Sequence, residues 1–165
     1  QSGVIAVIRL NDVSKLEQII SALSSGGIYA LEITLTTPNA VKIIAELARS
    51  TGKDFLIGAG TVLRPHEAEA VLAAGAQFVV SPVFNKQVVD LTTQADKVSI
   101  PGAFSSTEIL QAWDSGADIV KIFPATALGP NYFKDIHGPL PGIRLTPTGG
   151  VSLENAADFI RAGAF

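Results

Sequence analysis

Lys121 interrupts an otherwise apolar run, Asp-Ile-Val-Lys-Ile-Phe-Pro at residues 118–124. In a β-strand, alternation would place Ile119, Lys121 and Phe123 on one face, and both faces of this run are apolar enough to be buried. Burial lowers the pKa of an amine, so a buried lysine can act as a nucleophile. Alternatively, Lys121 belongs to a structural ion pair, or lies at a strand end with its amine reaching solvent.

A carboxylate occupies a similar position in the run Leu-Glu-Ile-Thr-Leu at residues 31–35. Alternation sets Glu32, Thr34 and Thr36 opposite the leucine and isoleucine side chains. A carboxylate that moves protons beside a nucleophilic amine forms an acid/base and nucleophile pair. The same two groups could instead form a buried ion pair. Both interpretations predict that Glu32 and Lys121 project into a common interior.

Two glycine-containing segments are candidates for ligand contact. Residues 58–61, Gly-Ala-Gly-Thr, would let the backbone approach a ligand and end in the hydroxyl of Thr61, although small residues also fill the ends of barrels. Residues 148–152, Thr-Gly-Gly-Val-Ser, would expose backbone N–H groups just before a helix beginning at Ser152. That arrangement is typical of an anion site, and the alternative is an ordinary tight turn.

Glycine also marks four similar junctions, at residues 25–29, 74–78, 115–119 and 162–165. Each glycine suits a helix C-cap, where a left-handed backbone is needed, and the residues after it suit the next strand. The junctions are roughly 41 to 48 residues apart, about twice the length of one strand-and-helix unit. They therefore mark every second strand of a repeating βα array.

Seven strands separated by helices are expected along the chain. The strands lie near residues 4–9, 29–35, 55–61, 77–81, 97–101, 118–123 and 143–147. Helix starts are predicted at Ser14 with Glu17 and Ser105 with Glu108 in capping-box spacing, at Pro38 and Pro65 in first turns, and at Ser152. A doubly wound sheet and a (β/α)₈ barrel both fit this order. Because the fourth junction ends at Phe165, the repeat favours a barrel lacking its last strand and helix.

Composition limits the class of protein. The chain has 165 residues, 47% hydrophobic and 16% charged, and is expected to form a single globular domain over residues 1–165. A net charge of −3 and a pI near 5.3, with no basic cluster, argue against nucleic acid and anionic membranes as partners. No signal pattern or spanning run is found and cysteine is absent, which is compatible with a cytoplasmic location. The first residue, Gln1, indicates a processed or incomplete sequence.

Histidine offers little for catalysis. His66 and His137 are far apart in the sequence and lack a matching carboxylate cluster, so we expect no bound metal.

Six segments, taken together and in order, resemble the 2-keto-3-deoxy-6-phosphogluconate (KDPG) aldolases and the related 4-hydroxy-2-oxoglutarate aldolases. They are Glu-Ile-Thr-Leu from Glu32, Gly-Ala-Gly-Thr-Val from Gly58, Ser81-Pro82, Ile-Pro-Gly from Ile100, Lys-Ile-Phe-Pro from Lys121, and Thr-Pro-Thr-Gly-Gly from Thr146. The resemblance implies a homotrimeric (β/α)₈ TIM barrel. It further implies a class I lyase that cleaves KDPG, a keto-acid phosphate, to pyruvate and glyceraldehyde 3-phosphate with no metal or other cofactor. The family's N-terminal helix and eighth strand are not found in this chain.

The resemblance also implies roles for individual residues. The expected site consists of Lys121 as the Schiff-base lysine, Glu32 as the general acid/base, and Arg9, Thr36, Thr61, Pro82, Phe123, Thr148, Gly149 and Gly150 as substrate-binding residues. Thr61 would hold the pyruvyl carboxylate, and Gly149 and Gly150 would face the phosphate. Thr36 stands where some members have an arginine. Arg9 matches an arginine found in many members and could bind the carboxylate with two hydrogen bonds.

Other activities remain open at this point. Cleavage of the galactonate epimer or of 4-hydroxy-2-oxoglutarate needs the same lysine and glutamate. A phosphate-binding barrel with isomerase or decarboxylase activity would share the glycine pair without forming an imine, and a fragment whose barrel does not close would be inactive. Borohydride trapping with pyruvate separates the aldolases from the rest.

Overall fold

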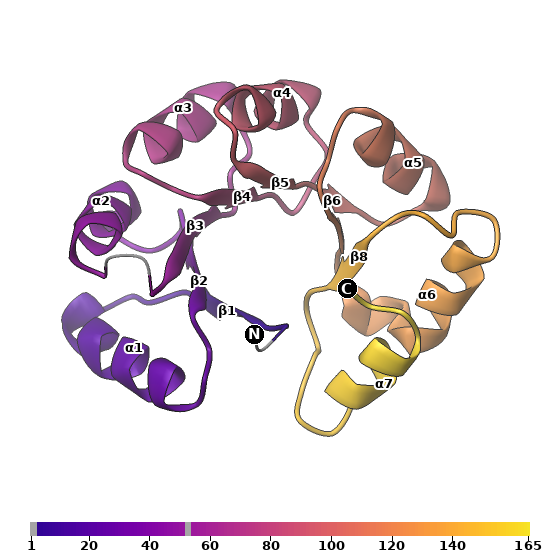
Figure 1. Ribbon diagram of the computed structural model, residues 1–165, viewed down its shortest axis with the longest axis horizontal. Helices are drawn as coiled ribbons and strands as arrows, with labels where there is room; N and C mark the ends of the chain where they lie inside the picture. The colour runs from indigo at the N-terminus through magenta and orange to yellow at the C-terminus, as the bar shows by residue number, and fades with distance from the viewer. Residues whose placement is uncertain (1–2, 52–53) are drawn as a thin grey trace.

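In the computed structural model, which describes residues 3–51 and 54–165, parallel strands form a curved inner wall and helices cover its outside (Figure 1). The strands are β1 (Ile5–Ile8), β2 (Ala30–Thr34), β3 (Leu56–Gly60), β4 (Phe78–Val80), β5 (Val98–Ile100), β6 (Gly102–Ala103), β7 (Val120–Ile122) and β8 (Leu145–Pro147). The helices are α1 (Leu16–Ser25), α2 (Ala40–Ser50), α3 (Pro65–Ala73), α4 (Lys86–Gln94), α5 (Ser106–Asp114), α6 (Gly129–His137) and α7 (Ala156–Arg161), with 3₁₀ turns η1 (Val13–Lys15) and η2 (Ala125–Ala127). The alternation confirms the predicted TIM-barrel type of fold.

The wall consists of two sheets, β1 to β5 and β6 to β8, each in chain order. They meet at Pro101, which separates β5 from β6 and has no backbone N–H to extend the ladder. Lys121 N nevertheless donates to Pro101 O at 2.8 Å, so β5 and β6 occupy one position in the wall. Among the described residues the wall is open between β8 and β1 (Figure 1). Phe165 N donates to Leu145 O at 2.8 Å, where the sequence predicts the next strand to begin.

Strand alternation decides which side chains face the helices. Leu31 and Ile33 are fully buried in the layer between the wall and the helices, where they belong to the same apolar cluster as Ile44 of α2. Glu32, between them, points to the opposite face. In β7, Lys121 lies between the fully buried Val120 and Ile122 in the same way. Both polar side chains therefore project from the concave side of the wall.

The predicted glycine C-caps are confirmed. Gly27, Gly75, Gly116 and Gly163 have φ values of 79°, 96°, 94° and 98°, a region that residues with a Cβ rarely adopt. Each glycine reverses the chain between a helix and the next strand.

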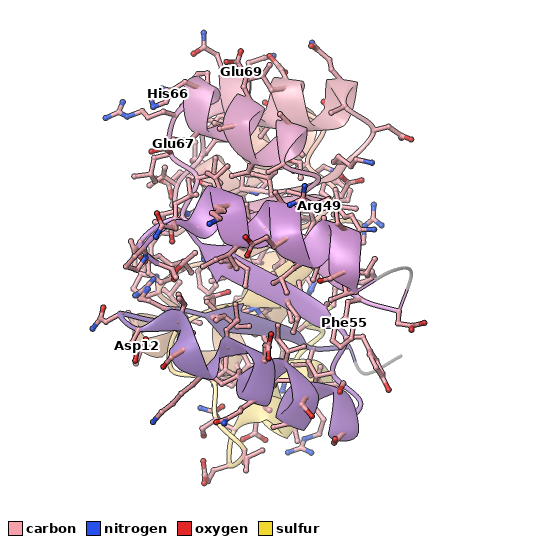
Figure 2. The ribbon with its side chains drawn as sticks, turned by 90° about the vertical axis from the view of Figure 1, so that its left-hand side faces the viewer. Asp12, Arg49, Phe55, His66, Glu67 and Glu69 are labelled. Carbon is pink, nitrogen blue, oxygen red and sulfur yellow. The ribbon has the colours of Figure 1, made fainter. Side chains whose placement is uncertain are left out.

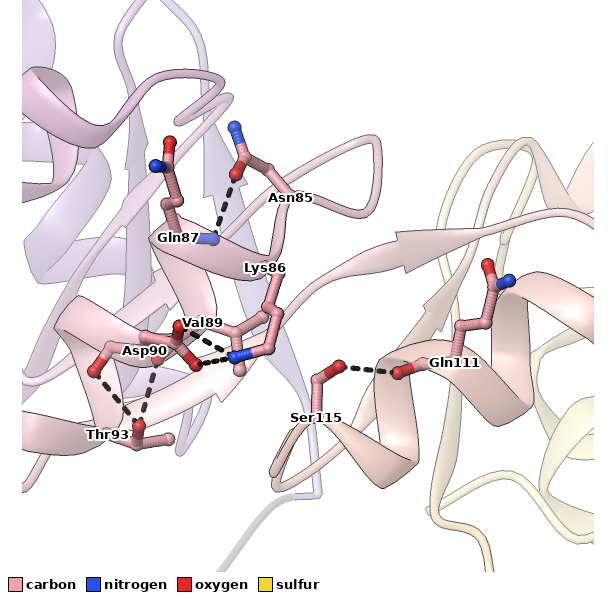
Figure 3. Close-up of polar contacts among 8 residues, drawn as sticks. All are labelled: Asn85, Lys86, Gln87, Val89, Asp90, Thr93, Gln111 and Ser115. Atoms are coloured by element: carbon pink, nitrogen blue, oxygen red, sulfur yellow. Dashed lines mark hydrogen bonds and ion pairs between the residues drawn. The ribbon is translucent and has the colours of Figure 1, made fainter.

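Two of the predicted helix starts are confirmed. Ser105 Oγ accepts a hydrogen bond from Glu108 N, and the Glu108 carboxylate accepts one from Ser105 N, which is a capping box. Pro65 is the first residue of α3. Polar contacts also support α4, where Asn85 caps the N-terminus through Gln87 N and Lys86 pairs with Asp90 at 2.8 Å (Figure 3).

The prediction of a capping box at Ser14 and Glu17 is wrong. Ser14 donates from both its backbone N and its hydroxyl to the carboxylate of Asp12, so its side chain is not available to cap α1. The 3₁₀ turn η1 is inserted, and α1 begins only at Leu16. Pro38 also precedes its helix rather than starting it, because Asn39 takes a left-handed conformation and α2 begins at Ala40.

Helices α1, α2 and α3 form part of the outer layer (Figures 1 and 2). His66 is exposed in the first turn of α3, on this outer side, and lies outside the pocket described below (Figure 2). None of the helices in residues 3–51 and 54–165 combines the length and apolar character that crossing a membrane requires.

Candidate active site

A pocket of about 680 Å³ lies on the concave side of the wall and brings together residues that are far apart in the sequence. Glu32 from β2 and Lys121 from β7 both line it, with Arg9 from the end of β1. Val80 of β4 and Ile100 of β5 add apolar surface. In barrels of this kind, chemistry takes place at the carboxyl ends of the strands, which is where Arg9 and the segment after β8 lie.

Lys121 is a buried amine, and its side chain is 5% exposed. Its Nζ lies 4.9 Å from the centroid of the Phe123 ring, on the same face of the strand. Burial lowers the pKa of Lys121 below its usual 10.5; the negative charge of Glu32 opposes this shift, and the positive charge of Arg9 adds to it. A larger fraction of the amine is therefore neutral at a given pH, which a nucleophilic lysine requires.

Glu32 is buried to a similar degree, at 3% exposure. Burial raises the pKa of its carboxyl group above the usual 4.5, and the positive charges of Lys121 and Arg9 partly offset that rise. The carboxyl group reaches across the neighbouring strand at Gly60, where an added Cβ would lie 1.9 Å from Glu32 Oε1. Glycine at position 60 therefore makes room for the carboxyl group. The raised pKa makes this carboxyl group easier to protonate, which suits a group that both gives and takes a proton.

Glu32 and Lys121 interact through charge without a direct bond. Among the described residues, neither side chain has a hydrogen-bond partner, and no ion pair joins them. Among all described residues, every side-chain nitrogen or oxygen that is fully enclosed has a hydrogen-bond partner. The polar atoms of Glu32 and Lys121 have none among these residues, so they are not fully enclosed and must be accessible from the pocket. This arrangement favours a reactive pair over the structural ion pair, because a substrate can enter between the two groups.

Arg9 is the third charged group of the pocket. It is exposed, and its positive charge acts on both Glu32 and Lys121. Its guanidinium has no partner among the described residues. A free guanidinium beside a nucleophilic amine can bind a carboxylate with two parallel hydrogen bonds.

The Gly149–Gly150 turn also lines the pocket, next to Thr148 and near the Phe123 ring. The two glycines have φ values of 88° and 74°, and the backbone N–H groups of Gly149, Gly150 and Val151 donate no hydrogen bond among the described residues. Unpaired amides of successive residues form a concave anion site. The prediction that a helix begins at Ser152 is wrong, because α7 begins at Ala156. The amides themselves, not a helix end, therefore carry the potential for anion binding.

Asn155 fixes this turn and was missed from the sequence. Its Nδ2 donates to Gly150 O and its Oδ1 accepts from Ser152 N, both at 2.8 Å. On the other side, Thr148 N donates to Ile122 O at 3.1 Å, which ties the turn to the strand that carries Lys121. The only signal in the sequence was the polar character of Asn155, which does not distinguish such a clamp from an exposed helix residue.

The structure does not place every expected residue at the pocket. Phe123, Thr148, Gly149 and Gly150 line it, together with Arg9, Glu32 and Lys121. Thr36, Thr61 and Pro82 follow β2, β3 and β4 at the same rim but are not among the described residues that surround the cavity. Thr36 is exposed and its hydroxyl is 2.9 Å from that of Thr34. Thr61 has a φ of 61°, which is uncommon outside glycine and recurs at functional sites. The roles of these three residues remain predictions.

The arrangement can support chemistry on a carbonyl compound. An amine with a lowered pKa can add to a ketone, a carboxyl group with a raised pKa can transfer protons beside it, and Arg9 can orient an adjacent carboxylate. An anion at the far end of the same molecule would meet the glycine amides.

Comparisons with known proteins agree with this chemistry. The family model described as KDPG and KHG aldolase matches residues 1–165. The 2-dehydro-3-deoxy-phosphogluconate aldolase of Treponema pallidum is 41% identical over 158 residues, which is 95% of this chain and 75% of that protein. The 2-dehydro-3-deoxy-6-phosphogalactonate aldolase of Escherichia coli is 36% identical over 145 residues, or 87% of this chain and 71% of that protein.

A solved structure of a KDPG aldolase has the same fold as this chain. KDPG aldolase from Legionella pneumophila, captured with pyruvate as a covalent carbinolamine intermediate, superposes with a TM-score of 0.88 at 36% identity. The match covers 96% of this chain and 77% of that one. With the family model matching its whole length and relatives above 30% identity, this chain belongs to the KDPG and KHG aldolase family.

Proposed function

We propose that this chain is a class I aldolase that cleaves KDPG to pyruvate and glyceraldehyde 3-phosphate through an imine on Lys121. The observation that carries the proposal is the buried amine of Lys121, with its lowered pKa, facing the same pocket as Glu32. Family membership supports the reaction type, since the Legionella pneumophila structure holds pyruvate as a covalent carbinolamine.

The reaction begins when neutral Lys121 Nζ adds to the ketone carbon of the substrate. Protonated Glu32 gives its proton to the carbinolamine hydroxyl, which leaves as water, and an iminium ion and the Glu32 carboxylate result. Glu32 then accepts the proton of the substrate hydroxyl as the neighbouring carbon–carbon bond breaks. The electron pair of that bond moves toward the iminium nitrogen to give an enamine, and the aldehyde product leaves. Glu32 returns the proton to the enamine carbon, and hydrolysis of the imine releases pyruvate and regenerates the amine.

The positions of the remaining polar groups fit the two ends of this substrate. Arg9 lies at the end of the pocket near Lys121 and Glu32, where the carboxylate next to the ketone would be held. The unpaired amides of Gly149 and Gly150 line the same pocket and suit the phosphate. Thr36, Thr61 and Pro82 are assigned to the rim of the substrate site on the family resemblance alone.

A comparison of substrates tests this proposal. We expect pyruvate release from KDPG, from its galactonate epimer and from 4-hydroxy-2-oxoglutarate, with the highest kcat/KM for KDPG. Relatives are named for the first two activities and for both KHG and KDPG, so the pocket residues must decide the preference. Release of pyruvate from none of the three would contradict the proposed reaction, and a higher kcat/KM for another substrate would change its assignment within the family.

Arg9→Lys is expected to raise KM for these substrates, because an ammonium group cannot reproduce the two parallel hydrogen bonds of a guanidinium. The change should be on the order of tenfold, as for the loss of one charge-assisted hydrogen bond. Steady-state kinetics measures it, with Arg49→Lys on the outer helix α2 as the matched control. Unchanged kinetics in Arg9→Lys would transfer carboxylate binding to Thr61 and backbone amides.

Assembly and location complete the proposal. A homotrimer and a cytoplasmic location are both expected from the family resemblance.

A further inference from the structure

Thr126 lies directly against the glycine turn of the pocket. It is the middle residue of η2, the 3₁₀ turn that follows β7 and Lys121. A Cβ added at Gly150 would lie 2.9 Å from Thr126 Oγ1, and one added at Gly149 would lie 3.6 Å from it. Thr126 therefore packs beside both glycines; a side chain at position 150 would crowd its hydroxyl, whereas one at position 149 would only make an ordinary van der Waals contact with it.

The backbone around Thr126 is fixed by a hydrogen bond, but the hydroxyl of Thr126 forms none among the described residues. Ala125 N donates to Thr148 O at 2.8 Å, which fixes η2 against the segment that carries the glycines. Thr126 Oγ1 itself forms no hydrogen bond with any residue in 3–51 or 54–165. The hydroxyl is therefore a free donor next to Gly149 and Gly150, whose amides are unpaired; Thr126 adjoins these two lining residues and is not itself among the described residues that line the cavity.

The Phe123 ring lies near both the amine and the glycine turn. Lys121 Nζ lies 4.9 Å from the Phe123 ring centroid, and a Cβ at Gly149 would lie 3.7 Å from an edge carbon of the same ring. The same Cβ would lie 3.6 Å from Thr126 Oγ1, so the Phe123 ring and the Thr126 hydroxyl both adjoin Gly149. A substrate bound to Lys121 and extended over Phe123 would bring its far end to the glycine turn and to Thr126.

We propose that Thr126 is a further substrate-binding residue, whose hydroxyl donates a hydrogen bond to the distal phosphoryl group alongside the amides of Gly149 and Gly150. This inference rests on the proposed function for the identity of the substrate. The sequence does not indicate this role, because a threonine after a strand belongs to no recognisable pattern. The structure supplies the contact with the glycines.

Thr126→Val tests the inference, since valine keeps the shape of threonine and removes the hydroxyl. The readout is the ratio of KM for KDPG to KM for 2-keto-3-deoxygluconate, which is the same molecule without the phosphoryl group. We expect this ratio to rise about tenfold, the effect of one hydrogen bond to a charged group at an exposed site. Thr126→Ser should restore most of the loss, and Thr107→Val, an exposed threonine on α5, should leave the ratio as in the wild type.

An unchanged ratio in Thr126→Val would overturn the inference, as would an equal rise in KM for both compounds. Binding of inorganic phosphate, measured by ³¹P NMR titration of the wild type and Thr126→Val, provides a second test that requires no cleavage. Weaker phosphate binding in the variant supports the role of the hydroxyl, and equal binding contradicts it. Failure of the proposed function has a different signature, since the wild type would then cleave neither compound and form no borohydride-stable adduct with pyruvate.

Discussion

Incubation with pyruvate and borohydride should attach a reduced pyruvyl group to Lys121, and Lys121→Ala should abolish that adduct. Borohydride reduces an imine to a stable amine, so mass spectrometry of peptides locates the modified residue. The expected selectivity follows from the environment of Lys121, whose burial lowers its pKa and leaves a reactive neutral amine at the pocket. Alanine removes the nucleophile, and no other lysine among the described residues lines this pocket.

The dependence of labelling on pH gives a second criterion. A lysine with a lowered pKa becomes neutral at lower pH, so the rate of adduct formation should rise with a midpoint below 10.5. Lys134→Ala on the exposed surface of α6 is the matched control and should keep the adduct. Label that spreads over surface lysines in proportion to their exposure, or that appears on Lys134, would contradict the imine mechanism.

Much of the wall was predictable because its signals are local. Glycine junctions and apolar runs together predicted seven strand positions, and each contains an observed strand within the predicted bounds. The division of the fifth strand at Pro101 was not predicted. Its cause is also local, since proline interrupts the ladder, but Lys121 N restores the contact from the neighbouring strand.

The helix starts show where local reasoning fails. Ser14 and Ser105 have the same spacing to a following glutamate, yet only Ser105 forms the capping box. The difference is Asp12, whose carboxylate accepts hydrogen bonds from both the backbone N and the hydroxyl of Ser14. Whether a serine forms a capping box depends on competition between neighbouring polar groups for its hydrogen bonds. The spacing of serine and glutamate alone carries no information about that competition.

The pair Glu32 and Lys121 was predictable because each breaks an apolar strand, which is costly unless the group has a use. Thr126 and Asn155 were not, since both are polar residues outside strands, where polarity is ordinary. Their contacts with the glycine turn depend on how β7 and β8 lie side by side. Sequence therefore indicated the reactive groups, and the structure was needed to find the residues around the far end of the pocket.

Glu32→Gln should reduce turnover by about 10²- to 10⁴-fold, the usual effect of removing one general acid/base. Glutamine keeps the size of the side chain that packs against Gly60, so the wall should fold as before. It cannot exchange a proton in the reaction, whereas the carboxyl of Glu32, whose pKa is raised by burial, can both give and accept one. The imine with pyruvate should still form on Lys121, but more slowly, because proton transfer also assists loss of water from the carbinolamine.

The two measurements together distinguish the role of Glu32 from a purely electrostatic one. Single-turnover cleavage reports the bond-breaking step, and borohydride trapping reports imine formation in the same sample. Loss of negative charge alone removes an influence that opposes the lowered pKa of Lys121, so it would leave more neutral amine and would not slow imine formation. Slower trapping and slower cleavage in Glu32→Gln, with Glu46→Gln on the surface of α2 unaffected, are therefore the signature of proton transfer by Glu32. Near-normal turnover with faster trapping would show instead that Glu32 acts on Lys121 only through its charge.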